Sequence, residues 1–260
     1  MKIPIYQVDA FTSKLFGGNP AAVCPLPRWL PDAKLQAIAA ENNLSETAFF
    51  VTKGGHCELR WFTPALEIDL CGHATLATAH IIFGQAGFTK DEIVFRTRKS
   101  GELRTFRNNG RIYLDFPARL PAPVEAPGEL VKGLGHFPRE VYKGRDYLAV
   151  FEKESDIAGM TPHYGELAKL DCIGIIVTAP GAKCDFVSRF FAPRAGIAED
   201  PVTGSAHTVL IPFWGERLGK TKMKALQISA RRGELDCQWK GDRVLMGGRA
   251  VTYMQGTIEI

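Results

Sequence analysis

Two long stretches of the chain carry no charged side chain, and each predicts a helix that is buried on nearly every face. The first runs from Leu70 to Thr89, and the second follows Pro201 and continues to Glu216. A helix that is apolar all round packs inside a protein core, because it has no face to offer to water. Glycine or proline interrupts both stretches, so neither reaches the roughly 18 to 20 uniformly apolar residues of a membrane span. We therefore expect two core helices and no membrane segment.

Shorter segments of alternating or β-rich character surround these helices and predict strands. In the first half they are residues 3–10, 21–24, 47–52, 58–62, 93–97, 103–106 and 112–116, and in the second half 146–151, 174–178, 185–191, 225–230, 235–239, 244–247 and 256–260. Amphipathic helices are expected at 31–40, with a start signal at Pro31 and a stop at Asn42 and Asn43, and at 162–170. Many strands around one fully apolar helix favour an α+β fold in which a curled antiparallel sheet, like a β-barrel, encloses the helix.

The chain also contains an internal repeat, which predicts two pseudo-symmetric lobes. When residues 67–74 are shifted by 132 positions (199 minus 67), their glutamate, glycine and last alanine fall on those of residues 199–206. A Phe-x-Pro sequence precedes each copy, at 62–64 and at 191–193. A repeat that takes up half the chain is too long for a solenoid unit. The proline-rich stretch 117–127 is the best boundary, so we expect lobes at 1–117 and 118–260. The last strand is free to return to the first lobe.

Composition narrows the class of protein. The 260 residues are 45% hydrophobic with a net charge of +4, which supplies two cores and fits a small anionic substrate, but gives no nucleic-acid footprint. The start of the chain has no signal-peptide pattern, so we expect a cytoplasmic protein. The six cysteines are scattered without zinc spacing. They are interpreted as buried free thiols, and no metal site is predicted.

Nucleotide and triad motifs are missing. The segment Gly215–Thr221 resembles a phosphate-binding loop, but it has three residues between its glycines where four are needed, and it follows a helix. A helix end capped by Gly219 is the better interpretation. No G-x-G-x-x-G, G-x-S-x-G or H-E-x-x-H pattern occurs, so we expect no cofactor.

The candidate catalytic residues are chosen by where they lie relative to the predicted helices and strands. Glu46 lies at a helix-to-strand junction, where a lone glutamate is more often an ordinary turn carboxylate than a catalytic one. Aligning residues 49–52 with 175–178 places it opposite Cys172, so only the first lobe has an acid at this position. His73 follows a helix-opening glycine, whereas His207 and His80 lie further inside their helices, where a core role is preferred. Asp200, before the second helix, fits either a catalytic acid or a simple response to the helix dipole.

The helix starts at Gly72 and Gly204 predict where a substrate would bind. The first backbone N–H groups of a helix have no internal partner and carry the positive end of its dipole, so two such ends facing one cleft would hold a carboxylate. Thr203, which directly precedes Gly204, is included among the expected substrate contacts.

Four ordered motifs resemble one family. They are VDAF with GNPAAV at 8–11 and 18–23, NLSETAF at 43–49, LCGHATLATA at 70–79 and EDPVTGSA at 199–206, and together they resemble the phenazine-biosynthesis isomerase (PhzF-like) family over essentially the whole chain. The resemblance implies the diaminopimelate-epimerase-like fold, with two lobes that each form a β-barrel around a central helix. It also implies a cofactor-free site between the lobes and, as in many members, a homodimer.

Carried over by position, the family's catalytic glutamate falls on Glu46, and its assisting residues fall on His73, Asp200 and Ser205. Related two-thiol racemases use a cysteine from each lobe. Here Cys71 matches the first thiol position, but Thr203 stands at the second. The leading hypothesis is a cofactor-independent isomerase in which Glu46 moves a proton on a small carboxylate-bearing substrate. The alternatives are a one-thiol racemase or epimerase that uses Cys71, and a carboxylate-binding protein without catalysis.

Overall fold

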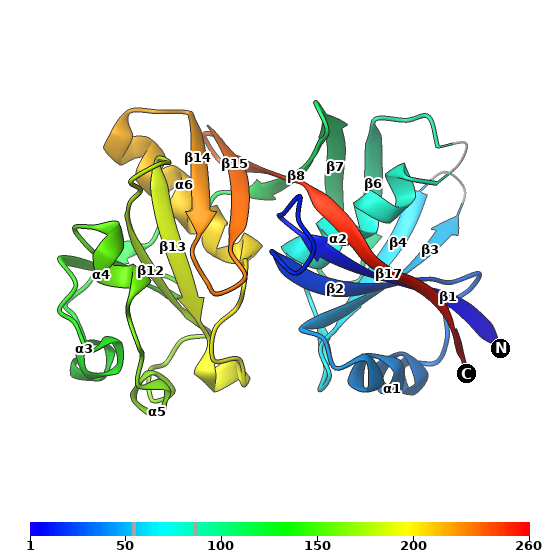
Figure 1. Cartoon of the computed structure of the whole chain (residues 1–260), viewed down its shortest axis with the longest axis horizontal. Coiled ribbons are helices and arrows are strands. Elements are labelled where there is room, and N and C mark those ends of the chain that lie inside the picture. Colours follow the sequence, from blue (N-terminus) through cyan, green and yellow to red (C-terminus); the bar gives the residue numbers. More distant parts are fainter. Residues whose placement is uncertain (54–55, 86–87) are drawn as a thin grey trace. The chain divides into compact units, whose positions relative to one another are not determined.

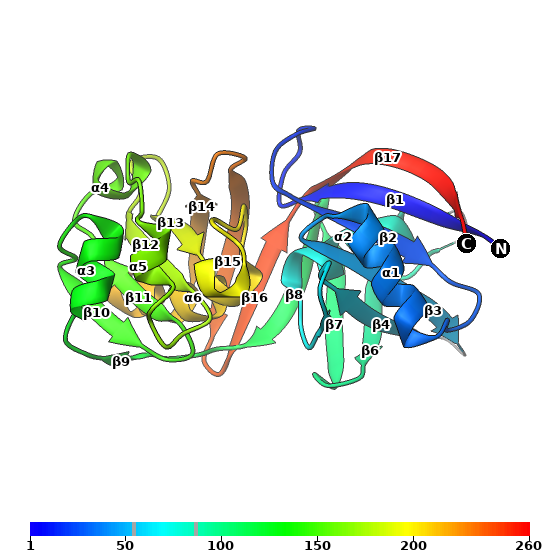
Figure 2. The ribbon, with the colours of Figure 1, turned by 90° about the horizontal axis from the view of Figure 1, so that it is seen from below.

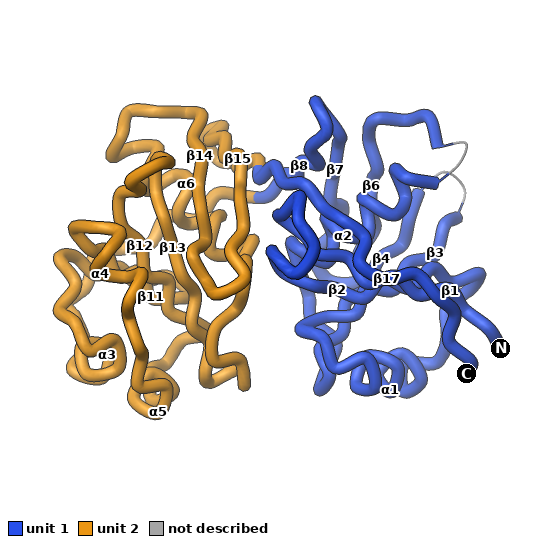
Figure 3. The backbone as a smooth tube through the Cα atoms, in the orientation of Figure 1, with its two compact units in different colours: residues 1–116, 246–260 blue, residues 117–245 orange. Residues whose placement is uncertain are grey.

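A computed structural model describes residues 1–53, 56–85 and 88–260, and its chain divides into two compact units (Figure 1). Unit 1 comprises residues 1–116 and 246–260, and unit 2 comprises residues 117–245 (Figure 3). The chain passes into unit 2 after Phe116 and returns to unit 1 after Leu245. Among the described residues, none of the helices combines the length and the apolar character needed to cross a bilayer.

Unit 1 is built around the first uncharged stretch. Its elements are β1 (Lys2–Ala10), β2 (Asn19–Pro25), α1 (Asp32–Asn42), β3 (Glu46–Lys53), β4 (His56–Phe62), β5 (Glu67–Ile68), α2 (Gly72–Phe83), β6 (Glu92–Thr97), β7 (Glu102–Asn108), β8 (Arg111–Pro117) and β17 (Ala250–Glu259). As expected, α2 begins at Gly72 and is almost entirely buried, and it packs against β1, β2, β3 and β17. The last strand pairs with β1, with Lys2 opposite Glu259 (Figure 2).

Unit 2 is built around the second uncharged stretch. Its elements are β9 (Ala122–Pro123), α3 (Gly128–Leu134), β10 (Glu140–Lys143), β11 (Tyr147–Val150), α4 (Glu154–Ala158), α5 (Tyr164–Leu167), β12 (Ile175–Pro180), β13 (Phe186–Phe191), a 3-10 turn (Pro193–Ala195), α6 (Gly204–Leu218), β14 (Lys222–Gln227), β15 (Gly233–Lys240) and β16 (Arg243–Gly248), whose last residues belong to unit 1. As expected, α6 begins at Gly204, and Gly219 ends it in the left-handed conformation at φ 62°.

The predicted antiparallel sheet is wrong in one respect, because the strands form mixed rather than purely antiparallel pairings. In unit 1 β2 pairs parallel with β3, and β4 with β6. In unit 2 β11 pairs parallel with β12, and β13 with β14. A helical segment connects the two strands in each of these pairs. Such a crossover returns the chain to the same end of the sheet, so the strands run the same way. The α+β class is confirmed.

Other differences are local. The helix expected at 162–170 is limited to α5, and α3, α4 and β10 lie in stretches for which no element was predicted. These elements are short, from four to seven residues, so their hydrophobic periodicity is too brief to detect. Of the six cysteines, Cys172 and Cys184 are only partly buried, whereas the other four are buried as expected.

The glutamate of each repeat copy holds a buried arginine, and we call each arrangement an arginine clamp. In unit 1 Arg60 Nε and Nη2 each donate to Glu67 at 2.7 Å, and the guanidinium lies 5.0 Å from the Phe62 ring centre. The hydrogen bonds from Arg60 hold the pKa of the Glu67 carboxyl below its usual range. A fork of two charge-assisted bonds fixes orientation as well as distance. The clamp therefore fixes the loop between β4 and α2.

Unit 2 contains the same arrangement. Arg189 donates to Glu199 through Nε at 2.8 Å and Nη2 at 2.9 Å, and its guanidinium lies 4.9 Å from the Phe191 ring centre. Its remaining nitrogen, Nη1, donates to the carbonyls of Ile157 and Met160. The repeated glutamates and phenylalanines in the sequence thus have a structural role that the sequence analysis did not assign. They position the segment that leads into each core helix.

Candidate active site

Glu46 is the first residue of β3, where the chain leaves α1 and enters the sheet. Asn43 ends α1 with a left-handed φ of 48°, and its N–H donates to the Ala39 carbonyl. Asparagine tolerates this conformation better than most residues do. The turn brings Glu46 into register with Ala21 of the parallel strand β2, and leaves the glutamate only 8% exposed. A buried carboxylate at a strand end is a candidate catalytic group.

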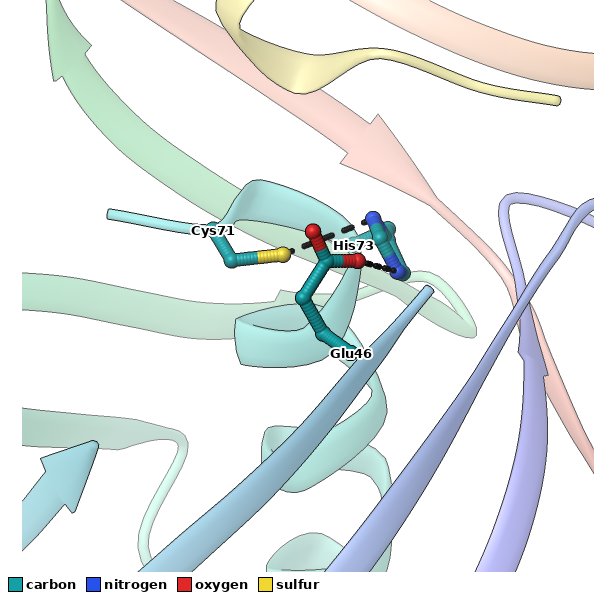
Figure 4. A group of neighbouring side chains, drawn as sticks. All are labelled: Glu46, Cys71 and His73. Carbon is teal, nitrogen blue, oxygen red and sulfur yellow. Dashed lines mark hydrogen bonds and ion pairs between the residues drawn. The ribbon is translucent and has the colours of Figure 1, made fainter. Parts of the chain in front are cut away.

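His73 contacts Glu46 from the first turn of α2 (Figure 4). The two side chains form an ion pair, with 3.0 Å between His73 Nε2 and Glu46 Oε2. The opposite ring nitrogen, Nδ1, lies 3.2 Å from Asn19 Nδ2 and 3.5 Å from Cys71 Sγ. An asparagine amide can offer Nδ2 to a neutral ring or Oδ1 to a protonated one. In both states His73 carries its Nε2 proton toward Glu46.

The electrostatics of this group favour a charged histidine and a neutral thiol. Burial would lower the pKa of His73, but its contacts with Cys71 and Glu46 outweigh burial and raise that pKa well above its ordinary value. Burial, together with the Glu46 charge, raises the pKa of the Cys71 thiol. The sulfur is therefore protonated near neutral pH, and the raised pKa favours a protonated His73 in its ion pair with Glu46.

The same three side chains could also supply ligands to a metal ion. Glu46, Cys71 and His73 can each offer one ligand atom, and those atoms lie within 4.8 Å of one another. In this structure Cys71 contacts Nδ1 of His73 and Glu46 contacts Nε2 (Figure 4). A zinc ion binds one nitrogen of a histidine ring at about 2.0 to 2.1 Å, so a metal here would displace at least one of the two contacts.

In unit 2 the predicted residues Asp200 and Thr203 contact each other. The Thr203 hydroxyl donates to Asp200 Oδ2, and the Thr203 N–H donates to Gln227 Oε1 at 2.8 Å. The Gln227 amide in turn donates to the Asp200 carbonyl at 2.8 Å and to the Thr203 hydroxyl at 3.1 Å. Gln227 thus holds together the turn that precedes α6.

Ser205 occupies the first turn of α6 and accepts a hydrogen bond from Arg145 Nη2 at 2.9 Å. The helix begins at Gly204 without a side-chain cap from Thr203, and α2 likewise begins at Gly72 without one from Cys71. The residues that precede the two helices therefore make no side-chain hydrogen bond to their first N–H groups. These N–H groups can bind an anion only if such caps are missing.

His207 and His80 occupy structural positions. His207 is fully buried beside Phe186, and its Nδ1 donates to the Thr203 carbonyl at 2.8 Å. Burial lowers the pKa of His207 to about 4, so it is neutral near physiological pH. His80 Nε2 lies 3.1 Å from the Thr252 hydroxyl.

Three polar residues of these groups were not singled out from the sequence, namely Asn19, Arg145 and Gln227. For Asn19 a signal existed, because it follows Gly18, whose φ is +60°. A Cβ on Gly18 would lie 2.1 Å from the Ala10 carbonyl oxygen, so only glycine permits the approach that carries Asn19 to His73. Arg145 and Gln227 reach their partners from 60 and 24 residues away, and no local pattern reveals such contacts.

Comparison with known proteins identifies the family. Residues 8–256 match the model of the phenazine biosynthesis-like protein family, PhzC-PhzF. An uncharacterized isomerase from Pseudomonas aeruginosa is 51% identical over 260 residues, with both chains fully covered. The crystal structure of a PhzF-family protein from Enterococcus faecalis is 48% identical and superposes with a TM-score of 0.97, with both chains fully covered. The chain belongs to the PhzC-PhzF family, and the predicted resemblance is confirmed.

The enzyme class follows from the same relatives. Proteins 51%, 48% and 44% identical to this chain, matched over 99% or more of their length, are named isomerases, and this chain is an isomerase of the PhzF type. A hydroxyproline epimerase from Agrobacterium vitis is 10% identical and has a TM-score of 0.63, with 99% of this chain and 92% of that one covered. At that identity the likeness concerns the fold alone.

Proposed function

We propose that this isomerase moves a proton on a small carboxylate-bearing substrate without a cofactor, and that Glu46 is the acid and base that carries the proton. The observation that supports Glu46 most directly is its buried ion pair with His73. Glu46 Oε2 and His73 Nε2 lie 3.0 Å apart, and both residues are less than 10% exposed. Buried ionisable pairs that shift the pKa of a member, as this one shifts that of His73, are concentrated at functional sites.

The proposed chemistry follows from the charges of the pair. An ionised Glu46 takes a proton from a substrate carbon, becomes neutral, and returns the proton to another carbon. Protonated His73 stabilises the ionised form of Glu46 before the transfer, and its positive charge stabilises negative charge that develops on the substrate during it. Between the two steps the proton is on the Glu46 carboxyl group, where it exchanges with solvent before the carboxyl group returns a proton to carbon, so no external acid is needed.

The residues of unit 2 are proposed to bind the same substrate. The uncapped first turn of α6 would hold the substrate carboxylate through backbone N–H groups, with Asp200, Thr203 and Ser205 around it. The first turn of α2 at Gly72 would act in the same way. That these groups and Glu46 serve one cleft between the lobes is carried over from the family pattern. A homodimer is proposed on the same ground, and light scattering tests it.

A one-thiol racemase that uses Cys71 is the weaker candidate. A thiol acts as a base or nucleophile through its thiolate, and burial together with the Glu46 charge raises the pKa of Cys71. A carboxylate-binding protein without catalysis would have no use for a buried Glu46 and His73 pair. The observation in favour of the thiol is its 3.5 Å contact with His73 Nδ1, and the raised pKa of Cys71 weighs against it.

Deuterium incorporation tests the proposal. The protein is incubated in heavy water with a panel of small cyclic and acyclic amino and hydroxy acids, and label at substrate carbon is followed by NMR. Glu46→Gln keeps the shape of the side chain but cannot accept the proton, so labelling should fall on the order of a hundredfold or more. Glu41→Gln, at an exposed position of α1, is the matched control and should label normally. Full labelling by Glu46→Gln would refute the role of Glu46.

A further inference from the structure

A cavity in unit 2 lies next to the predicted catalytic residue Ser205. Its volume is about 430 Å³, and it is lined by Arg145, Asp171, Cys172, Ile173, Arg194 and Ala195. Arg145 connects the cavity to α6, because its Nη2 donates to Ser205 Oγ at 2.9 Å. A cavity of this volume is large enough for part of a small molecule. Neither the proton transfer nor the helix N-terminus requires it.

A buried carboxylate fixes Arg145 in place. Arg145 Nε and Nη2 donate to Asp146 Oδ2 at 3.2 and 2.8 Å, and Asp146 Oδ1 accepts the Gly174 N–H at 3.1 Å. The Asp146 side chain is only 2% exposed, whereas that of Arg145 is 37% exposed. The guanidinium is therefore oriented before any ligand arrives, which lowers the entropic cost of binding.

One side of the guanidinium remains available. Arg145 Nη1 makes no hydrogen bond to any residue that the structure describes, whereas Nε and Nη2 are engaged. The second arginine of the cavity, Arg194, donates from Nη1 to Asp171 Oδ1 at 2.8 Å, but that aspartate side chain is fully exposed. Ion pairs at such exposure contribute little, so an incoming anion can displace Asp171 at small cost. The cavity thus presents two arginine side chains.

We propose that this cavity binds a second oxyanion group of the substrate, a carboxylate or a phosphate, with Arg145 as the residue that determines specificity for it. The inference rests on the proposed function, in which the first carboxylate is held at the helix N-termini. Because a guanidinium binds an oxyanion through its fork of N–H groups, Arg145 would hold one end of the molecule while Ser205 and α6 hold the other. The substrate is then a dianion rather than a simple amino acid.

Binding of rigid probes tests this assignment. Benzoate carries one carboxylate, isophthalate and terephthalate carry two, and 4-phosphonobenzoate replaces one of them by a phosphonate. Titration calorimetry on the full chain should give tighter binding of at least one doubly charged probe than of benzoate. Arg145→Gln should weaken that probe by about tenfold or more, the size of one charge-assisted hydrogen bond, and should change benzoate binding by less than about threefold. The phosphonate and dicarboxylate probes distinguish the two oxyanions.

Two further variants keep the test decisive. Arg217→Gln is the matched control, because Arg217 is also in unit 2, is 35% exposed and pairs with a single carboxylate, that of Glu140. It should bind every probe as the wild type does. Arg145→Lys keeps the charge opposite buried Asp146 and loses the fork, so it should weaken the best doubly charged probe severalfold even if the glutamine variant does not fold. The assignment is overturned if neither Arg145 variant weakens a doubly charged probe, or if Arg217→Gln weakens it equally.

The two proposals fail separately. Glu46→Gln should abolish labelling in heavy water and leave binding of the doubly charged probes unchanged. If Glu46→Gln labels normally while Arg145→Gln loses the doubly charged probe, the proton-transfer proposal is refuted and the anion site stands. If Glu46→Gln stops labelling while Arg145→Gln binds all probes normally, the anion site is refuted and the proton transfer stands.

Discussion

Replacing His207 should make the protein markedly less sensitive to acid. His207 is fully buried, and its Nε2 has no hydrogen-bond partner among the described residues. Protonation would therefore place an unsatisfied charge in the core of unit 2. Burial lowers the pKa of His207 to about 4, whereas an unfolded chain has the ordinary histidine value of about 6.5. Between these values the unfolded state binds more protons than the folded state does, so stability falls as the pH falls.

The magnitude follows from the two pKa values. The contribution is fully present above about pH 6.5 and is lost as the pH drops toward 4. With a folded-state pKa of about 4, the loss between pH 8 and pH 5 is about 2 kcal/mol, and it approaches about 3 kcal/mol at pH 4. A small protein has a free energy of unfolding of about 5 to 15 kcal/mol, so the loss caused by this one histidine is a substantial fraction of the total stability.

Two variants test this reasoning by urea unfolding at pH 8 and pH 5. His207→Asn keeps an N–H donor for the Thr203 carbonyl and loses the ring, whereas His207→Phe keeps an aromatic ring beside Phe186 and loses the donor. Both are expected to be destabilised at pH 8, for different reasons. Both should nevertheless lose about 2 kcal/mol less than the wild type on going to pH 5. An acid response equal to that of the wild type in both variants would refute the assignment of the proton to His207.

Further variants test other parts of the structure. Gly18→Ala should lower the free energy of unfolding by more than about 2 kcal/mol, because its Cβ would lie 2.1 Å from the Ala10 carbonyl oxygen. Gly101→Ala is the control: its φ is +67° but a Cβ there meets nothing within 4 Å, so it should cost only the backbone strain of about 1 to 2 kcal/mol. Equal losses in urea unfolding would contradict this reasoning. Cys71→Ser should keep most of the deuterium-labelling activity, because the raised thiol pKa leaves little thiolate to lose, and a variant without activity would favour the thiol mechanism. Arg60→Met should destabilise the protein by about 1.5 to 3 kcal/mol, because partly buried Glu67 loses a fork of charge-assisted bonds and keeps only its contact with Arg98. A loss below about 0.5 kcal/mol in thermal unfolding would show that the clamp is dispensable.

The sequence was most informative where a pattern was long. Uncharged stretches of 20 residues (70–89) and 14 residues (202–215) predicted the two core helices, which begin at Gly72 and Gly204 as expected. The parallel strand pairs could not be predicted, because alternation shows that a segment is a strand but does not show which neighbour it pairs with. For the same reason the repeat predicted two lobes without revealing their mixed pairings.

In the candidate site, too, the residues in short motifs could be predicted and their distant partners could not. Glu46, Cys71 and His73 could be singled out because each lies in a short recognisable motif, and the structure brings these three together. The motif that contains Asp200 and Ser205 also contains Thr203, yet the partners that hold these residues, Gln227 and Arg145, are distant in sequence. Contacts of this kind depend on tertiary structure alone, and no property of the isolated segments predicts them.

The arginine clamps also bear on how this chain could have arisen and changed. Arg60 with Glu67 and Arg189 with Glu199 show the same fork, each stacked on the phenylalanine two residues after the arginine. Gene duplication is the simplest origin of such a match. Neither clamp includes the positions that differ between the halves, such as His73 and its counterpart Ser205. Mutation could therefore change the reacting groups of one half while the arginine clamp kept the core helix of that half in place. New substrates could then be bound without a change of fold.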